Sequence, residues 1–419
     1  MLLPRNLKNS LLEAAVDTPV VLVNGARQTG KSTLIKALFA DSPTPPEYIS
    51  LDDLALLNAA LKDPQSFIER LPDTVIIDEI QRAPELMLPI KYSVDRNRRP
   101  GRFFLTGSAD VLALPKVADT LVGRIEIHTL WPLSQGEIHG VCESFIDTIF
   151  GDSKLKAAKN IELSELINIM NIGGYPDALL RETLTRRKNW FDGYITTLIE
   201  RDVRDLRNIE QLTLMPKLME LIASRAGRLL NYSDIARSLE MKLTTVKMYI
   251  SLLELLYLIV PVQPWFGDIG KRLVKSPKIY FNDTGLLCHL LGVDATAVIK
   301  DGSLLGMVYE NFVLMELIKQ ISWSEYKPRL YHFRTENGDE VDIVLEGRDG
   351  RIVGIECKAN SLARGASKGL QALKELTGKK FHRGIILYTG SHIIGIDKDI
   401  EAVPVSALWG TSSGAAPIL

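Results

Sequence analysis

Residues 25–33, GARQTGKST, have the residue types and spacing to bind the phosphates of a nucleotide. The stretch matches G-x-x-x-x-G-K-[ST] and lies between an apolar run and a segment with helical spacing. Its glycines let the backbone wrap closely around an anion, and the amides at a helix N-terminus then face that anion. Lys31 would reach the β- and γ-phosphates, and Ser32 would offer a hydroxyl to Mg²⁺. We therefore expect ATP to contact Gly25, Gln28, Thr29, Gly30, Lys31, Ser32 and Thr33.

An acidic pair, Asp78-Glu79, ends the apolar run VIIDE. In open α/β sheets, ligands bind at the carboxyl ends of the strands, where such side chains gather. Asp78 would hold Mg²⁺ directly or through water, and Glu79 would polarise the water that attacks the γ-phosphate. An acidic strand end that is merely solvated is the alternative, and the phosphate-binding stretch weighs against it.

Two further positions are candidates for the same site. In LTGS, Thr106 and Ser108 end another apolar run, and one of them could sense the γ-phosphate, with Thr106 the residue we assign to nucleotide binding. Arg124 opens the next run and could act as an arginine finger in a neighbouring subunit, which would require a homo-oligomer. A surface salt bridge is an equally good interpretation of Arg124.

A second group of reactive residues lies in DEVDIVLEGRDGRIVGIECKAN, residues 339–360. Side chains alternate along a strand, so Glu356 and Lys358 project together while Val353, Ile355 and Cys357 face the other way. A turn at GRDG would bring the two runs back antiparallel. Several registers then place Asp342 beside Glu356.

Two carboxylates that lie side by side repel each other unless a cation sits between them. Asp342 and Glu356 would suit Mg²⁺ or Mn²⁺, which prefer hard oxygen ligands. Lys358 could position or deprotonate a water, or stabilise charge on a scissile phosphate. A half-solvated hairpin with cross-strand ion pairs is the alternative.

The elements that must position these residues follow from the apolar pattern. Continuous apolar runs separated by helical segments predict a doubly wound parallel sheet with helices on both faces. The expected strands are residues 20–25, 48–53, 74–79 and 101–108, and residues 124–130, which alternate, could be a fifth.

The rest of the chain predicts three further regions. Residues 160–225 are mostly helical, and residues 231–262 have the pattern of a winged helix-turn-helix. Its second helix could enter a DNA groove or serve only as a packing module, because its exposed positions offer Lys242, Lys247 and little else that is basic. Residues 306–321 read as an amphipathic helix. We expect domains at 1–135, 136–225, 226–290 and 300–410, and a flexible tail at 411–419.

The order of these motifs resembles an AAA-type P-loop ATPase. GARQTGKST, TVIIDEIQRAPELM and FFLTGSADVL are similar to a large prokaryotic group of such ATPases with a C-terminal region of unknown function. GGYPDALL, YITTLIERDVRDL, KIYFNDTGLL and YENFVLMEL resemble that C-terminal region. The resemblance covers nearly the whole chain, and it implies ATP and Mg²⁺ as cofactors.

The Asp…Glu-x-Lys arrangement resembles the restriction-endonuclease-like nucleases, which include Holliday-junction resolvases. In that superfamily an acidic residue on the helix before the sheet often joins the site, and Glu310 occupies the matching place here. The resemblance implies a metal-dependent nuclease site of Glu310, Asp342, Glu356 and Lys358.

Bulk composition sets outer limits. A chain of 419 residues suggests about two to four domains. Its formal charge of -1 gives no global basic field for nucleic acid. Three separated cysteines argue against zinc and disulfides and fit a reducing cytosol. The N-terminus lacks the apolar core of a signal peptide. The sequence contains no run of 18 apolar residues, so we expect no membrane span.

Together these observations predict a cytoplasmic, Mg²⁺-dependent ATPase whose nucleotide state controls a C-terminal effector that acts on DNA, by binding or by cleavage. Two alternatives remain open. The chain could be a signalling or scaffold ATPase whose C-terminal carboxylates are structural, or an ATP-switched DNA-binding protein with an inert nuclease-like domain.

Overall fold

The structure is a computed structural model that describes residues 3–110, 121–151, 153–155, 160–203, 212–267, 276–359, 362 and 365–410. The expected tail at 411–419 lies outside the described residues. The chain forms two compact units. The first comprises Arg5–Trp131 with Leu255–Tyr257, and the second comprises Met1–Pro4, Pro132–Glu254 and Leu258–Leu419.

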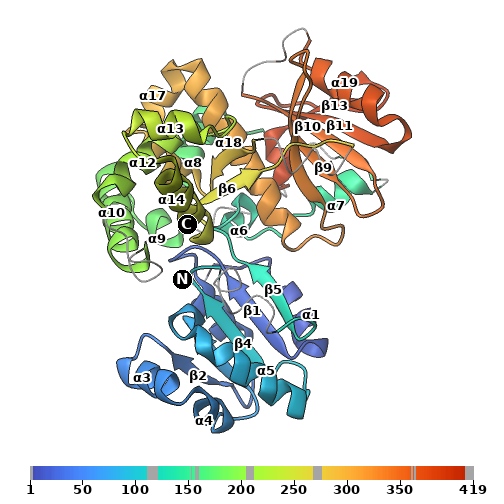
Figure 1. The fold of residues 1–419 in the computed structure, drawn as a ribbon. Helices are drawn as coiled ribbons and strands as arrows, with labels where there is room; N and C mark the ends of the chain where they lie inside the picture. Colours follow the sequence, from blue (N-terminus) through green and yellow to red (C-terminus); the bar gives the residue numbers. More distant parts are fainter. Residues whose placement is uncertain are drawn as a thin grey trace. The chain divides into compact units, whose positions relative to one another are not determined.

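The first unit contains a five-stranded sheet in the order β2-β3-β4-β1-β5, with every neighbouring pair parallel (Figure 1). The five expected strands are confirmed as β1 (Val20–Asn24), β2 (Glu47–Ser50), β3 (Val75–Asp78), β4 (Phe103–Gly107) and β5 (Ile125–Thr129). The prediction for 48–53 was too long, because the side chain of Asp53 caps the next helix by accepting from the amides of Ala55 and Leu56.

Helices cover both faces of this sheet because its strands are apolar on both sides. Val21 and Val23 pack with the first two helices, whereas Val20 and Leu22 face the core under the other three. These helices are α1 (Lys8–Asp17) and α2 (Lys31–Leu38) on one face, and α3 (Leu54–Lys62), α4 (Pro64–Glu69) and α5 (Met87–Arg96) on the other. Two 3₁₀ turns, Ile80–Arg82 and Pro84–Leu86, precede α5. The expected doubly wound arrangement is therefore confirmed.

The segment Leu255–Tyr257 belongs to this first unit although it lies far along the chain. The amide of Asp110 donates to the carbonyl of Leu255 at 2.9 Å. The ring of Tyr257 packs edge-on against Trp131, with 5.8 Å between the ring centres.

The second unit begins with helices, as expected for 160–225. A capping box formed by Ser134 and Glu137 starts the first of them. Their bounds are α6 (Gln135–His139), α7 (Phe145–Phe150), α8 (Leu163–Ile172), α9 (Pro176–Leu179), α10 (Leu184–Thr197), η4 (Leu198–Val203), η5 (Leu212–Leu214) and α12 (Met215–Ala223).

The segment expected to be a helix-turn-helix contains two helices followed by a two-stranded antiparallel sheet. The elements are α13 (Tyr232–Ser238), α14 (Leu243–Leu255), β6 (Ile259–Val262) and β7 (Lys278–Phe281). Two short helices follow, α16 (Thr284–Leu290) and α17 (Ala295–Lys300).

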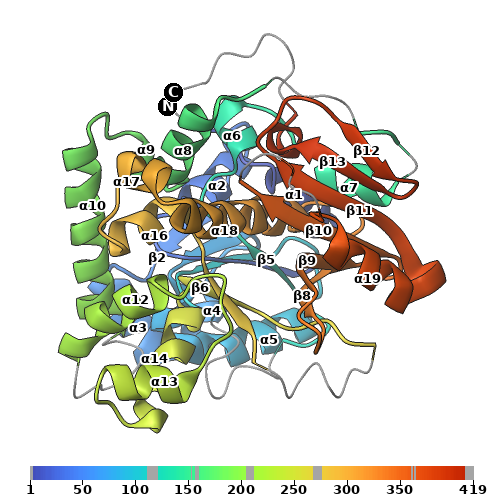
Figure 2. The same ribbon diagram turned by 90° about the horizontal axis from the view of Figure 1, so that it is seen from above.

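A six-stranded mixed sheet closes the second unit, in the order β12-β13-β11-β10-β9-β8 (Figure 2). Its strands are β8 (Arg329–Arg334), β9 (Glu340–Glu346), β10 (Ile352–Lys358), β11 (Phe381–Tyr388), β12 (Ile394–Asp397) and β13 (Ile400–Pro404). The expected antiparallel hairpin is confirmed as β9 and β10. Helix α19 (Lys368–Thr377) packs against β9, β10 and β11, and the 3₁₀ turns Gly378–Lys380 and Val405–Leu408 follow.

The helix expected to be amphipathic is instead buried on most sides. It is α18 (Gly302–Ile321), which begins four residues earlier than predicted because Asp301 caps the amides of Ser303 and Leu304. Leu305, Val313 and Leu317 are buried, and so are Asn311 and Glu316. Polar residues on a buried helix need partners, so those of α18 define contacts inside the unit.

No helix in the described ranges combines the length and apolar character that crossing a membrane requires.

Candidate functional site

The phosphate-binding stretch forms the loop between β1 and α2. Gly25 has φ 146° and Gly30 has φ 94°, conformations that L side chains rarely adopt. A Cβ on Gly25 would lie 2.2 Å from the carbonyl oxygen of Leu130, whereas nothing lies within 4 Å of one on Gly30. Gln28 and Thr29 lie in the loop, and Lys31, Ser32 and Thr33 form the first turn of α2.

The ammonium of Lys31 lies inside this loop. Its Nζ donates to the carbonyl oxygens of Gly25 and Ala26, each at 2.9 Å, and the side chain is buried. The hydroxyl of Thr29 donates to Ala26 at 2.9 Å, and the guanidinium of Arg5 donates to the carbonyl of Thr29 at 3.0 Å. These bonds shape a loop around a cation, which is what an anionic phosphate would require.

The carboxylate of Asp78, at the end of β3, accepts hydrogen bonds from three hydroxyls. Ser32 donates to Oδ1 at 2.8 Å, Tyr48 donates to Oδ2 at 2.5 Å, and Thr106 also donates to Oδ1. Burial, and then the bond to Asp78, raises the pKa of Tyr48 well above its ordinary value, so Tyr48 remains a donor. A carboxylate beside a hydroxyl oxygen at the edge of a phosphate loop is a donor set that fits Mg²⁺.

Glu79 follows in a left-handed conformation, φ 61°, which turns its side chain away from the strand direction. Its Oε2 accepts from the hydroxyl of Ser108 at 3.1 Å and from the side-chain amide of Gln81. Gln81 also donates to Ser108 at 2.8 Å. The backbone amide of Glu79 donates to the hydroxyl of Thr106 at 3.2 Å. Thr106 therefore joins Asp78 to Glu79, and Ser108 contacts the side chain of Glu79.

Arg124 stands at the amino end of β5, opposite the sheet edge that carries the phosphate loop. Its Nε and Nη2 contact the carboxylate of Asp95 at 2.5 and 3.1 Å. The salt bridge that the sequence left open is thus present.

In the second unit, β9 and β10 bring Asp342, Glu356 and Lys358 together, as the sequence predicted. Lys358 Nζ lies 2.9 Å from Oε1 of Glu356. The amide of Asp342 donates to Oε2 of Glu356 at 3.4 Å, and the amide of Cys357 donates to Oδ2 of Asp342 at 2.8 Å. The predicted neighbourhood of Asp342 and Glu356 is therefore present.

Glu310 also reaches this group, but through residues that the sequence did not single out. Lys278 Nζ lies 3.1 Å from Oε1 of Glu310, 2.7 Å from Oε1 of Glu340 and 4.0 Å from Oδ1 of Asp342. The hydroxyl of Tyr280 donates to the same oxygen of Glu310 at 2.6 Å. We call Lys278, Tyr280, Glu310, Glu340, Asp342, Glu356 and Lys358 the carboxylate cluster.

Burial dominates the electrostatics of this cluster. It raises the pKa of Asp342 well above its ordinary value, and the charges of Glu310 and Glu356 act in the same direction. Burial also raises the pKa of Glu356, against the opposing effect of Lys358. Within the described part of the chain, no set of three or more His, Cys, Asp or Glu side chains is arranged to hold a metal ion. The Mg²⁺ or Mn²⁺ ion expected here does not fit this arrangement.

An open cleft of about 390 Å³ lies in front of Glu356 and Lys358. Lys368, at the start of α19, contacts Asp339 at 2.8 Å across it. Its lining residues are Gly338, Asp339, Glu340, Glu356, Lys358, Gly365, Ala366, Lys368 and Gly369.

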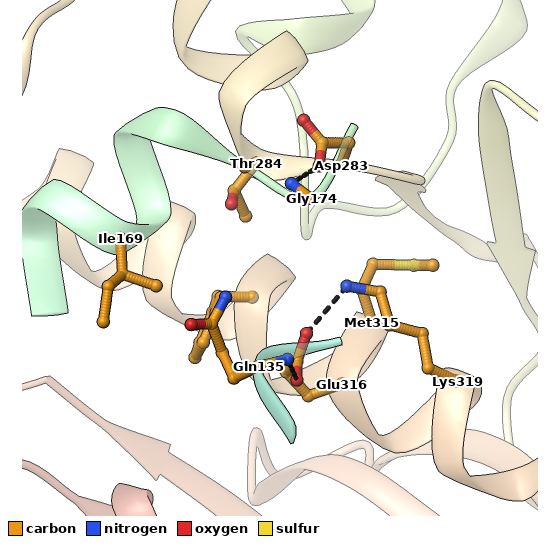
Figure 3. Close-up of a pocket in the computed structure, with 10 residues that line it drawn as sticks. Gln135, Ile169, Gly174, Asp283, Thr284, Met315, Glu316 and Lys319 are labelled. Carbon is orange, nitrogen blue, oxygen red and sulfur yellow. Dashed lines mark hydrogen bonds and ion pairs between the residues drawn. The ribbon is translucent and has the colours of Figure 1, made fainter. Parts of the chain in front are cut away.

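The motifs GGYP and FNDTG, for which we predict no chemistry, meet the part of α18 around Met315, Glu316 and Lys319 elsewhere in the second unit (Figure 3). The amide of Gly174 donates to Asp283 at 2.6 Å, and Lys319 contacts Glu316 at 2.7 Å. The cavity between them is about 10 Å³, space for roughly one water molecule. These motifs therefore build the interior of the unit.

Sequence reasoning missed Tyr48, Gln81, Lys278, Tyr280 and Glu340. Gln81 lies only two residues beyond Glu79, so its position in the sequence could have indicated a contact with that carboxylate. Tyr48 and Lys278 reach their partners only through the pairing of distant elements, which no local pattern reveals.

Three family models match successive parts of the chain. An AAA domain matches residues 17–139, and two domains of unknown function, DUF8612 and DUF4143, match residues 163–297 and 305–408. The first match and the parallel sheet agree with the expected AAA-type core, a nucleotide-binding type of domain. The third match does not identify the last domain as restriction-endonuclease-like.

Relatives match over almost the whole chain. An uncharacterized protein of Mycobacterium tuberculosis is 31% identical over 410 residues, which cover 98% of this chain and 85% of the relative. A protein of Mycobacterium bovis matches to the same extent. An uncharacterized protein of Methanocaldococcus jannaschii is 23% identical over 403 residues, covering 88% of this chain and 80% of the relative.

Among solved structures, AMPPCP-bound DnaA from Aquifex aeolicus is 15% identical, with 59% of this chain and 85% of that chain covered and a TM-score of 0.30. The Holliday junction branch migration motor RuvB of Thermotoga maritima is 20% identical, with 61% and 88% covered and a TM-score of 0.28. At these scores neither likeness carries an argument about this chain.

Proposed function

We propose that this chain binds ATP with Mg²⁺ and hydrolyses it. The chain belongs to the same family as the uncharacterized mycobacterial proteins, and it carries an AAA domain. The observation that carries this proposal is the convergence of Lys31, Ser32, Asp78 and Glu79 at one edge of the parallel sheet. We further expect the protein to work in the cytoplasm.

Each residue has a chemical role in this proposal. Loop amides and Lys31 would bind the phosphates, and Ser32 and Asp78 would hold Mg²⁺, which neutralises phosphate charge when bound. Glu79 would accept a hydrogen bond from the attacking water and orient it. Thr106, bonded to both Asp78 and the amide of Glu79, would connect the metal side of the site with the water side. Arg124 of another copy would add positive charge, which implies a homo-oligomer.

The test compares ATP binding and turnover in two variants of the full chain. Lys31→Ala should lose ATP binding, because it removes the cation from the loop. Glu79→Gln should keep binding and lose turnover by roughly 10²- to 10⁴-fold, as expected for removal of a general base. ATP turnover that survives in Glu79→Gln at the wild-type rate would disprove the assignment of Glu79.

A second candidate function concerns the second unit. We propose that the nucleotide state controls an effector cleft that acts on DNA, and that this cleft cleaves a phosphodiester held beside Glu356 and Lys358. The supporting observation is the Glu356–Lys358 pair at the mouth of the open cleft. A winged helix formed by α13, α14, β6 and β7 would contribute to DNA contact.

Supercoiled plasmid incubated with Mg²⁺ or Mn²⁺, with and without ATP, tests this second function. Nicking that disappears in Glu356→Ala and Lys358→Ala, while ATPase activity remains, would support it. DNA binding without nicking would instead favour an ATP-switched DNA-binding protein. A signalling or scaffold ATPase would neither bind nor nick DNA.

A further inference from the structure

Lys278 places a buried ammonium among the carboxylates of the second unit. The side chain is only 6% exposed, yet it carries a full charge into the interior. Such burial is costly unless opposite charges lie close by. Three carboxylates do so here, Glu340 at 2.7 Å, Glu310 at 3.1 Å and Asp342 at 4.0 Å.

The backbone that carries Lys278 is held firmly. The side chain of Asn311 on α18 accepts from the amide of Phe281 at 2.8 Å and donates to its carbonyl at 2.9 Å. The amide of Gly227 donates to the carbonyl of Ile279 at 2.8 Å. Alternation along β7 then points Lys278 and Tyr280 the same way, and both reach Oε1 of Glu310. The ammonium is thus positioned by the fold and is not a loose surface charge.

A divalent ion bound by both Glu310 and Asp342 would need the space and the oxygens that Lys278 already uses. Metal ligands lie about 2.0–2.6 Å from Mg²⁺ or Ca²⁺. An ion at that distance from both carboxylates would lie close to Nζ and be repelled by it. Lys278 and such an ion therefore exclude each other at this place.

We propose that Lys278 is the resident cation of the carboxylate cluster, so that its ammonium takes the place a divalent metal would occupy between Glu310 and Asp342. The cluster stays together without metal as long as Lys278 is present. This inference goes beyond the second function proposed above, because it concerns the cation that the same group of carboxylates holds. It does not depend on whether the cleft cleaves DNA.

Metal rescue of the full chain tests the proposal. Thermal unfolding of wild type should be the same in EDTA and in about 1 mM MnCl₂. Lys278→Gln should unfold at a lower temperature in EDTA, because it leaves carboxylates unpaired. MnCl₂ should then raise that temperature by roughly 5 °C or more, as expected when ligand well above its Kd binds only the folded state.

Lys319→Gln is the matched control. Lys319 is equally buried and contacts Glu316 at 2.7 Å, but its other bond goes to the carbonyl of Leu133 at 3.0 Å. Its loss should destabilise the chain without rescue by MnCl₂. If Lys278→Gln does not fold, the double variant K278Q/E340Q removes one positive and one negative charge together. It keeps Glu310, Asp342 and Glu356 as ligands, and MnCl₂ should raise its unfolding temperature in the same way.

The outcomes separate this inference from the second proposed function. The resident-cation proposal would be overturned if MnCl₂ stabilised wild type as much as the Lys278 variants. It would also be overturned if MnCl₂ stabilised neither of the Lys278 variants. Rescue of these variants by MnCl₂ supports the resident cation even if no plasmid is nicked. In that case only the cleavage proposal fails.

Discussion

The hydroxyl of Ser32 donates a 2.8 Å hydrogen bond to Oδ1 of Asp78, across 46 positions of the chain. The two residues meet because the loop after β1 and the end of β3 lie at the same edge of a parallel sheet. On β4, the strand between them, Thr106 also donates to Asp78. The candidate Mg²⁺ ligands are therefore assembled by strand order.

Asp78→Asn should lower Mg²⁺-dependent ATP turnover by at least roughly 100-fold, because it removes the charge that would hold the metal. Ser32 and Thr106 can still donate to the amide oxygen, and the hydroxyl oxygen of Tyr48 can accept from the amide NH₂, so the variant should fold. Titration of ATP with and without Mg²⁺ should show that Mg²⁺ strengthens binding to wild type but not to the variant. Asp52→Asn, at an exposed carboxylate paired with Arg82, is the control and should behave as wild type.

Gln81→Leu should reduce kcat by roughly 10- to 100-fold and leave KM for ATP nearly unchanged, because misplacement of a reacting group costs rate more than affinity. Gln81 bonds both Glu79 and Ser108 and so orients the carboxylate that would activate water. Steady-state kinetics at varied ATP separate the two constants. Gln65→Leu removes a comparable but remote contact to Glu69, at 2.7 Å, and should change neither constant. A rise in KM alone in Gln81→Leu would contradict a positioning role.

Gly174→Ala should destabilise the chain strongly, because a Cβ there would lie 2.2 Å from the carbonyl oxygen of Leu133. Gly193→Ala is the counterpart, since Gly193 lies inside α10 and nothing surrounds its added Cβ within 4 Å. That change should stabilise the chain by about 0.5–1 kcal/mol through helix propensity. Chemical denaturation of both variants measures the difference. Equal stability of the two variants would show that the backbone around Gly174 and Leu133 can shift to accommodate the added Cβ.

Glu143→Gln should make stability less dependent on pH. Burial, then the charges of Glu316 and Glu137, raises the pKa of Glu143 to about 8. Between its ordinary pKa and about 8, the folded state holds a proton that the unfolded state has lost. Stability therefore falls as pH rises through this window, by up to about 1.4 kcal/mol per pH unit.

Denaturant unfolding of wild type and Glu143→Gln at pH 5 and pH 8 measures this effect. The variant should gain stability relative to wild type at pH 8 but not at pH 5, because glutamine never ionises. Glu325→Gln, at an exposed carboxylate, should follow the wild-type profile. A constant difference between wild type and Glu143→Gln at both pH values would rule out the raised pKa as the cause.

Much of the nucleotide-binding unit could be predicted because its signals are local. Apolar runs predicted four of the parallel strands and an alternating run indicated the fifth, and the glycine spacing predicted the loop that surrounds Lys31. The side-chain contacts of each residue were harder to predict from the sequence. Tyr48 lies on a neighbouring strand, and only sheet order places its hydroxyl on Asp78. The helix expected at 306–321 is present, but its expected amphipathic character was wrong, because periodicity does not show that several elements surround α18.

By itself the sequence determined the strand–loop–helix that surrounds Lys31, the acidic strand end after β3, and the faces of the hairpin that carry Glu356 and Lys358. These follow from neighbours a few residues apart, where backbone geometry leaves few choices. Only the tertiary structure decided which charges meet. Lys278 reaches Glu310, Glu340 and Asp342 from a strand far away in the chain, because β7 is held against α18. A buried charge takes the partners that three-dimensional packing leaves within a few ångströms.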